Sequence, residues 1–246
     1  MLEKINTDRR LERDEYHERI PGLQIRMFEL QRICSNAGIG VILVFEGWAV
    51  SGKGAVIKKL TERLEPRAYE IHAVLEPRTH ELPLPWLYRF WKRLPTYGHM
   101  GVFDHGWHQV VVNGHVSGDF SEADRIRFFE HTNSFERALA DDRYVVAKLF
   151  TQISEEEQSR RLEELAADES TAWRIEDRHW EEHRNHEAYL TAFEEVLART
   201  ETEWAPWTII EAHDRRWARV KLFETLITRL EEELVRHGVD PERRQP

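Results

Sequence analysis

Residues 41–54 of this 246-residue chain restrict its possible folds more than any other segment. The apolar, β-branched run VILVF is typical of a buried strand, and it leads into the pattern G-x-x-x-x-G-K, from Gly47 to Lys53. Residues 55–60 then have the spacing of a helix. A strand, a glycine loop and a helix in this order predict a phosphate-binding P-loop, because loop N–H groups and the positive end of the helix solvate phosphate oxygens.

Individual residues of this loop have distinct predicted roles. Gly47 and Gly52 let the backbone turn tightly and approach an anion, and Lys53 adds a point charge. Gly54 stands where nucleotide-hydrolysing P-loops place the Ser or Thr that ligates Mg²⁺, so a metal must be held differently here. The predicted phosphate-binding residues are Gly47, Ser51, Gly52, Lys53, Gly54, Lys58 and Lys59. Two alternatives stay open: a chance Gly/Lys turn, and ordinary solvated helix charges at the last two lysines.

Composition favours a folded globular protein over a membrane or nucleic-acid-binding protein. Hydrophobic residues make up 41% of the chain, which includes nine Trp, so a packed core is expected. The formal net charge of −10 disfavours general nucleic-acid binding, and a polyanionic ligand would need a local basic groove. No apolar run reaches the roughly 18 residues of a membrane span, and the N-terminus has no secretory segment. We therefore expect a cytoplasmic protein without membrane association.

Apolar runs alternate with helical patterns along the chain. Strands are expected near residues 40–45, 69–75, 100–104, 144–150 and 207–211. Helical segments separate these strands, which is the signature of a parallel sheet covered on both faces. The predicted fold class is therefore α/β: a P-loop kinase-like three-layer sandwich with a mainly parallel five-stranded sheet and a helical lid.

The chain is expected to form effectively a single domain. Residues 1–37 read as an N-terminal helical segment, either a long helix or a helical hairpin, that packs on the core. Residues 38–236 form the P-loop domain, and residues 237–246 form a flexible tail. The stretch 154–199 is charged and amphipathic, contains no strand pattern and follows the fourth strand, a position that suits a helical lid.

Several motifs outside the P-loop occur in the order found in one known family. They are Phe45-Glu46-Gly47-Trp48, Gly52-Lys53-Gly54, Ile57-Lys58-Lys59-Leu60, Leu94-Pro95, Gly98, Gly101-Val102-Phe103-Asp104, Lys148, Ile153-Ser154-Glu155-Glu156-Glu157-Gln158, Trp173-Arg174, Arg199-Thr200 and Glu203-Trp204-Ala205-Pro206-Trp207. Together they resemble the type-2 polyphosphate kinases over roughly residues 11–234. The segments 86–91 and 112–116 are most similar to the first half of the tandem polyphosphate:AMP phosphotransferases, whose second half carries the full catalytic set.

The resemblance implies an activity and a set of ligands. Members of the family move a phosphoryl group between inorganic polyphosphate and a nucleotide, here AMP, ADP or GDP, with Mg²⁺ as cofactor. It also implies Lys53 and Asp104 as catalytic residues and Asp104 as the metal ligand. We further expect a homo-oligomer that, given its charge and its lack of a long apolar run, binds neither nucleic acid nor membrane. Arg160, Arg161 and Arg174 would close over the phosphate chain from the lid. As alternatives, Asp104 merely caps a helix, and the arginines belong to a charged surface balanced by nearby glutamates.

Substitutions in this chain imply reduced activity. Active relatives have an aspartate at the position of Ala49, arginines at those of His105 and Val110, a tyrosine at that of His108 and a glutamate at that of Gly114. Loss of a metal-binding carboxylate weakens Mg²⁺ affinity, and loss of a phosphate-clamping arginine can slow transfer by about 10³-fold or more. The sequence thus favours a polyphosphate kinase 2-like phosphotransferase with low activity. The alternatives are an impaired relative that binds polyphosphate or nucleotide or pairs with an active partner, and a different P-loop kinase.

Overall fold

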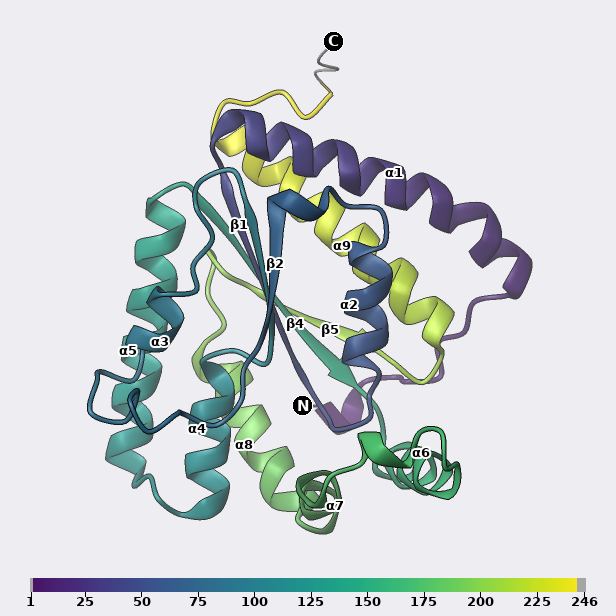
Figure 1. Cartoon of the computed structure of the whole chain (residues 1–246), viewed down its shortest axis with the longest axis vertical. Coiled ribbons are helices and arrows are strands. Elements are labelled where there is room, and N and C mark those ends of the chain that lie inside the picture. Colours follow the sequence, from purple (N-terminus) through teal and green to yellow (C-terminus); the bar gives the residue numbers. More distant parts are fainter. Residues whose placement is uncertain (1, 243–246) are drawn as a thin grey trace.

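The computed structural model describes residues 2–242, so residues 243–246 of the predicted tail lie outside the described part of the chain. Within that part, helices and strands alternate along the sequence (Figure 1). The strands are β1 (Gly40–Gly47), β2 (Tyr69–Ala73), β3 (Met100–Asp104), β4 (Tyr144–Gln152) and β5 (Trp207–Glu211). The α-helices are α1 (Arg13–Ala37), α2 (Lys53–Thr61), α3 (Tyr88–Trp91), α4 (His108–Ser117), α5 (Glu122–Asp141), α6 (Glu155–Ala167), α7 (Asp177–Arg184), α8 (His186–Arg199) and α9 (Arg215–Arg236).

The five strands form one parallel sheet in the order β2-β3-β1-β4-β5. This confirms the predicted α/β class and its mainly parallel sheet. Strands β3 and β5 have the expected bounds, whereas β1 and β4 each extend two residues further than expected and β2 ends two residues earlier. The extension of β1 pairs Gly47 with Thr151 of β4, so the first glycine of the loop still belongs to the sheet.

Strand β1 is the centre of the hydrophobic core. All eight of its residues are buried, and its side chains alternate between the two faces of the sheet. Val41, Leu43 and Phe45 join the core on one face, while Ile42 and Val44 join the core on the other. A strand buried on both faces needs a continuous apolar run, which explains why residues 41–45 carry no polar side chain.

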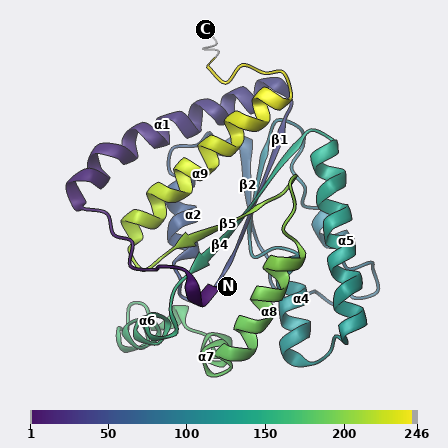
Figure 2. The ribbon, with the colours of Figure 1, turned by 180° about the vertical axis from the view of Figure 1, so that it is seen from behind.

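Helices cover both faces of the sheet and so complete three layers. Helices α1, α2 and α9 lie on one face, and α3 and α5 lie on the other (Figures 1 and 2). Helix α4 packs against α8. Residues 13–37 form one continuous helix that includes Pro21. Of the long helix and the helical hairpin expected for this segment, the structure therefore has the long helix. Helix α1 ends at Gly38, whose φ of 65° is the left-handed conformation that favours glycine after a helix.

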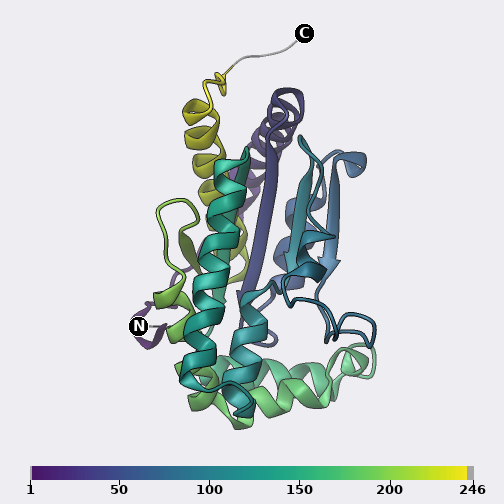
Figure 3. The ribbon, with the colours of Figure 1, turned by 90° about the vertical axis from the view of Figure 1, so that its left-hand side faces the viewer.

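Helices α6, α7 and α8 lie beneath the carboxyl ends of the strands, as the green ribbon in Figures 1 and 3 shows. Residues 154–199 contain no strand, in agreement with the sequence pattern. Helix α6 begins after Ser154, whose hydroxyl accepts a hydrogen bond from the backbone N–H of Glu157. Three helices are therefore positioned where the P-loop emerges from the sheet.

The last residues of the described chain contact helices α1 and α9. Glu242 forms an ion pair with Arg26 of α1, 2.6 Å away. Val239 donates its backbone N–H to Leu234 and packs against the core. No helix within residues 2–242 is both long enough and apolar enough to cross a membrane.

Candidate functional site

Backbone geometry at the end of β1 requires glycine at two positions. Gly47 has a φ of 131°, and a Cβ there would lie 2.4 Å from the carbonyl oxygen of Thr151. Gly52 has a φ of 100° and stands at the N-cap of α2, which no side chain caps. Since the first N–H groups of a helix have no partner within it, the loop presents uncapped donors at the start of α2.

Side chains of the loop fix it to the neighbouring strand. The hydroxyls of Ser51 and Thr151 lie 2.6 Å apart and are buried. The indole N–H of Trp48 donates to Gln152 at 2.8 Å, and its ring stacks on His186 with centroids 4.1 Å apart. Ser51, a predicted phosphate-binding residue, thus contacts β4 through its side chain, which leaves its contribution to an anion to the backbone.

The ammonium group of Lys53 lies beneath the loop. Its Nζ donates to the carbonyl oxygens of Gly47 at 2.7 Å and Trp48 at 3.2 Å, and only 8% of the residue is exposed. These two bonds hold a positive charge inside the turn, next to the uncapped N-terminus of α2. Lys53 is therefore positioned to attract an anion to the loop.

The other predicted residues of α2 point in different directions. Gly54 and Lys58 are both exposed and lie four residues apart, on the same face of the helix. Lys59 instead forms an ion pair with Glu62 at 2.6 Å. The structure therefore leaves Lys58 exposed on the helix face that carries Gly54 and pairs Lys59 with a glutamate.

Asp104 lies beside the loop at the carboxyl end of β3. It pairs in register with Phe45 of β1, two residues before Gly47, and its side chain is half-buried. The next residue, His105, has a φ of 61°, an unusual conformation for a residue with a side chain. The Nδ1 atom of His105 lies 2.9 Å from Glu46, whose other oxygen accepts the Gly106 N–H at 2.8 Å.

Charged side chains continue from Glu46 into the interior. Burial alone would raise the pKa of Glu46, but His105, together with His108 and the Gly106 N–H, outweighs burial and holds the pKa below its ordinary value. His108 lies between two carboxylates, with Nδ1 4.0 Å from Glu46 and Nε2 3.0 Å from Glu136. Glu136 in turn forms a fully buried ion pair with Lys148 at 2.7 Å.

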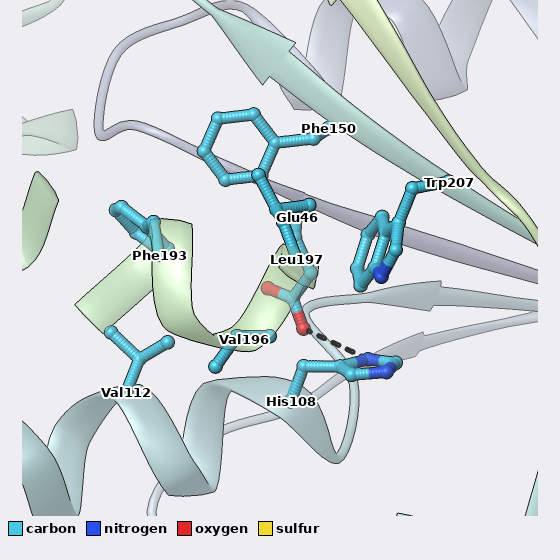
Figure 4. Close-up of a pocket in the computed structure, with 8 residues that line it drawn as sticks. All are labelled: Glu46, His108, Val112, Phe150, Phe193, Val196, Leu197 and Trp207. Atoms are coloured by element: carbon cyan, nitrogen blue, oxygen red, sulfur yellow. Dashed lines mark ion pairs between the residues drawn. The ribbon is translucent and has the colours of Figure 1, made fainter. Parts of the chain in front are cut away.

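A narrow void beside this buried chain has no room for a water molecule. Figure 4 shows the carboxylate of Glu46 directed toward His108 among apolar side chains. The lining residues are Glu46, His108, Val112, Phe150, Phe193, Val196, Leu197 and Trp207. Because the lining is mostly apolar and tightly packed, this region stabilises the base of the site and does not itself receive a ligand.

The three lid arginines have different surroundings. The Arg161 guanidinium is buried and donates to the carbonyl oxygens of Val50 and Ser51, at 3.2 and 2.9 Å. Its second terminal nitrogen, Nη2, donates to the carbonyl oxygens of Ala212 and His213, in the connection after β5. Arg160 is exposed and paired with glutamates of its own helix. Arg174 lies over the ring of Trp173. Their closure over a phosphate chain stays a prediction.

Sequence reasoning missed a group of lid residues that reach the loop. Glu182 Oε1 accepts hydrogen bonds from the Ala49 backbone N–H at 2.6 Å and from Gln158 at 2.9 Å. Burial raises the pKa of Glu182, although the charge of Lys53 opposes this. Burial also lowers the pKa of His179, which feels the charge of Lys53 as well. The partners Ala49 and Glu182 are 133 residues apart, and no local spacing signals such a contact.

The carboxylates at the site limit how a metal is held. Within residues 2–242 no group of three or more His, Cys, Asp or Glu side chains is arranged to bind a metal ion. Mg²⁺ commonly uses one or two carboxylates together with substrate phosphates and water. Asp104, half-buried beside the loop, fits that requirement as a single carboxylate, so a metal there would depend on the phosphate ligand for its remaining contacts.

A glycine loop at the end of a central parallel strand, with a lysine beneath it and helices across the carboxyl edge, defines a P-loop protein of the kinase type. The model of the family "Polyphosphate kinase 2 (PPK2)" matches residues 10–238, and the chain belongs to that family. The family predicted from the sequence motifs is thus confirmed.

Individual relatives differ in length. The chain is 32% identical over 236 residues to the polyphosphate:AMP phosphotransferase of Pseudomonas syringae pv. tomato, covering 96% of itself and 47% of that protein. It is 31% identical to ADP-polyphosphate phosphotransferase 3 of Rhizobium meliloti, covering 90% of itself and 78% of the relative. The chain therefore spans about half the length of the first of these relatives.

A solved structure shares the fold over the entire chain. The polyphosphate kinase 2 of Arthrobacter aurescens TC1 superimposes with a TM-score of 0.91 at 22% identity. That similarity covers 100% of this chain and 89% of the other.

Proposed function

We propose that this chain transfers a phosphoryl group between inorganic polyphosphate and a nucleoside mono- or diphosphate. The observation that carries the proposal is the loop at the end of β1, where Lys53 and the uncapped start of α2 combine two attractive features for phosphate. Family membership and the names of the relatives support polyphosphate and AMP, ADP or GDP as the substrates.

Each group near the loop has a proposed task. The loop N–H groups and Lys53 bind and orient phosphate oxygens, and exposed Lys58 extends the positive surface along α2. Asp104 would hold Mg²⁺, which when bound supplies positive charge to the transferring phosphoryl group. Positioning and charge stabilisation make up most of the catalysis in phosphoryl transfer, so these residues suffice for a slow reaction.

We also propose that transfer is slower than in relatives with a complete charge set. Ala49 carries no carboxylate, and Val110 packs against the apolar core beside Trp107. The imidazole of His105 is engaged with Glu46. Three positions that bear charge in active relatives therefore offer the transition state little or no charge.

The test is an assay of ADP formation from AMP, and of ATP formation from ADP, with polyphosphate and Mg²⁺. We expect turnover below the roughly 1–100 per second of ordinary kinases. Lys53→Ala should remove most of it, because it deletes the ammonium group that lies inside the loop. Lys92→Ala is the matched control, because Lys92 is an exposed lysine that lies over the ring of Tyr88, away from the loop. Turnover that Lys53→Ala leaves intact would contradict the proposal.

A second candidate is a chain that binds phosphate without transferring it. The uncharged side chains at Ala49 and Val110 favour this candidate. It predicts polyphosphate binding that Lys53→Ala weakens and added salt weakens further, with no turnover under any of the assay conditions.

A further inference from the structure

One P-loop N–H group already has an anionic partner within the chain. The carboxylate of Glu182, on lid helix α7, accepts the backbone N–H of Ala49 at 2.6 Å. The side-chain amide of Gln158, on α6, donates to the same oxygen at 2.9 Å. Ala49 lies between the two glycines of the loop, so the contact is made inside the G-x-x-x-x-G-K segment and not at its margin.

A carboxylate at this position resembles the ligand that the loop is built to attract. Loop N–H groups and the ammonium of Lys53 together form a positive concavity. Glu182 is close enough to Lys53 for the two charges to interact. A phosphate seated on the loop would meet this negative charge at short range, and it could not use the Ala49 N–H while Glu182 holds it.

We propose that Glu182 is an internal competitor for phosphate, and that a phosphate chain seats on the loop only after helix α7 moves away. This rests on the proposed function, because it assumes that the loop binds phosphate. Binding of the anion is then coupled to the movement of α7, so the position of α7 depends on whether the loop is occupied.

Helix α7 is attached in a way that allows such movement. It has eight residues, of which four are exposed and four, Glu182 included, are half-buried. None of the eight belongs to the hydrophobic core, and besides Glu182 its contact with α6 includes the hydrogen bond between His183 and Gln158 at 3.1 Å. The 3-10 turn at residues 172–174 precedes it, and Asn185 separates it from α8. In contrast, Arg161 of α6 is buried and tied to carbonyl groups of the loop and of the β5–α9 connection. Elements with little buried apolar surface open at low free-energy cost, so α7 can separate while α6 stays in place.

Titration calorimetry of the full chain with sodium tripolyphosphate tests the competition. EDTA is included so that no divalent cation bridges the two negative charges. The variants are Glu182→Gln, which keeps the shape but removes the charge, and Glu182→Ala, which removes the contact. Glu181→Gln is the matched control, since Glu181 is the exposed neighbour on the same helix. We expect both Glu182 variants to bind about tenfold tighter than the wild type, and the control to bind like the wild type.

Adding Lys53→Ala to the wild type and to Glu182→Gln separates the two proposals. Equal affinity of the wild type and both Glu182 variants, with binding lost on Lys53→Ala, would overturn the competition and leave the proposed function standing. Weaker binding by both Glu182 variants would also overturn it, because Glu182 would then assist the anion. No detectable binding by any variant would remove both proposals.

Hydrogen exchange gives a second, independent measurement. In the wild-type chain, tripolyphosphate should speed amide exchange in residues 177–184 at least severalfold while the loop amides stay protected. Exchange in α7 that tripolyphosphate leaves unchanged would overturn the proposal, even if the affinities follow the expected order.

Discussion

The guanidinium of Arg161 donates to the carbonyl oxygen of Ser51 at 2.9 Å, across 110 residues of sequence. The same side chain also reaches the carbonyl groups of Ala212 and His213. One lid arginine therefore joins the P-loop to the connection that follows β5. This arrangement makes Arg161 a structural support of the loop in the present conformation.

Replacement of Arg161 should destabilise the protein strongly. Arg161→Ala leaves several buried carbonyl groups without a donor, and the expected loss in the free energy of unfolding is about 3 kcal/mol. Urea unfolding followed by tryptophan fluorescence measures this value. Arg67→Ala is the control, because its exposed ion pair with Glu65 should contribute less than about 1 kcal/mol. A similar small loss for both variants would contradict the supporting role of Arg161.

The carboxylate of Glu157 should make stability depend on acid pH. Hydrogen bonds from Arg160 and Arg161 lower the pKa of Glu157 to about 2. An unfolded chain has a glutamate pKa of about 4.3, so this contribution is complete above that pH and is lost as the pH falls toward 2. Glu157→Gln should therefore be less stable than the wild type at pH 6, by at most about 3 kcal/mol.

Unfolding curves at a series of pH values measure this dependence. The difference in unfolding free energy between the wild type and Glu157→Gln should shrink steadily from pH 5 to pH 2. A difference that stays constant over that range would show that the ion pairs do not stabilise the folded carboxylate.

The buried pair of Lys148 and Glu136 should show strong coupling. Lys148→Met leaves the carboxylate uncompensated in the interior, at an expected cost of about 3–5 kcal/mol. Adding Glu136→Gln removes that charge while keeping an acceptor for the indole N–H of Trp107. The double variant should therefore lose less stability than the sum of the single variants. Additive losses in denaturant unfolding would argue against a coupled pair, and Arg67→Ala, at an exposed pair, should have little effect.

Restored charges should raise the rate of transfer. The variant with Ala49→Asp, His105→Arg and Val110→Arg returns one carboxylate and two cations to positions around the loop. We expect at least about a tenfold gain in turnover that depends on Mg²⁺, since each group stabilises charge in the transition state. A well-folded triple variant that binds polyphosphate and gains no activity would refute the proposal that these three substitutions slow transfer.

The fold could be predicted from the sequence because the patterns that indicate its strands and its glycine loop are local. The run at residues 41–45 is apolar without interruption, as a strand buried on both faces must be, and the glycines that follow are demanded by their backbone angles. The predicted positions of the strand ends were less accurate. Residues 46–47 and 151 extend their strands because pairing between β1 and β4 continues to Gly47 and Thr151, and Gln152 pairs with Glu211 of β5. Such pairing is not visible in any one of these segments alone.

The surroundings of the site could be predicted only in part. The loop and Asp104 follow from where strands end in a parallel sheet. The role of Arg161 and the position of Glu182 depend on how the lid helices pack, since a charged residue in an amphipathic helix has no local feature that reveals its partner. For the same reason the burial of His108 between two carboxylates was not anticipated.

The central place of β1 has a consequence for the cost of binding. Its backbone is paired with β3 on one edge and β4 on the other, and Gly47 itself is still within the β4 ladder. The first part of the loop therefore loses its conformational entropy when the protein folds, and ligand binding does not require a further loss there. The phosphate binding that we propose for the loop would in this sense be a property of the folded sheet, established before any anion arrives.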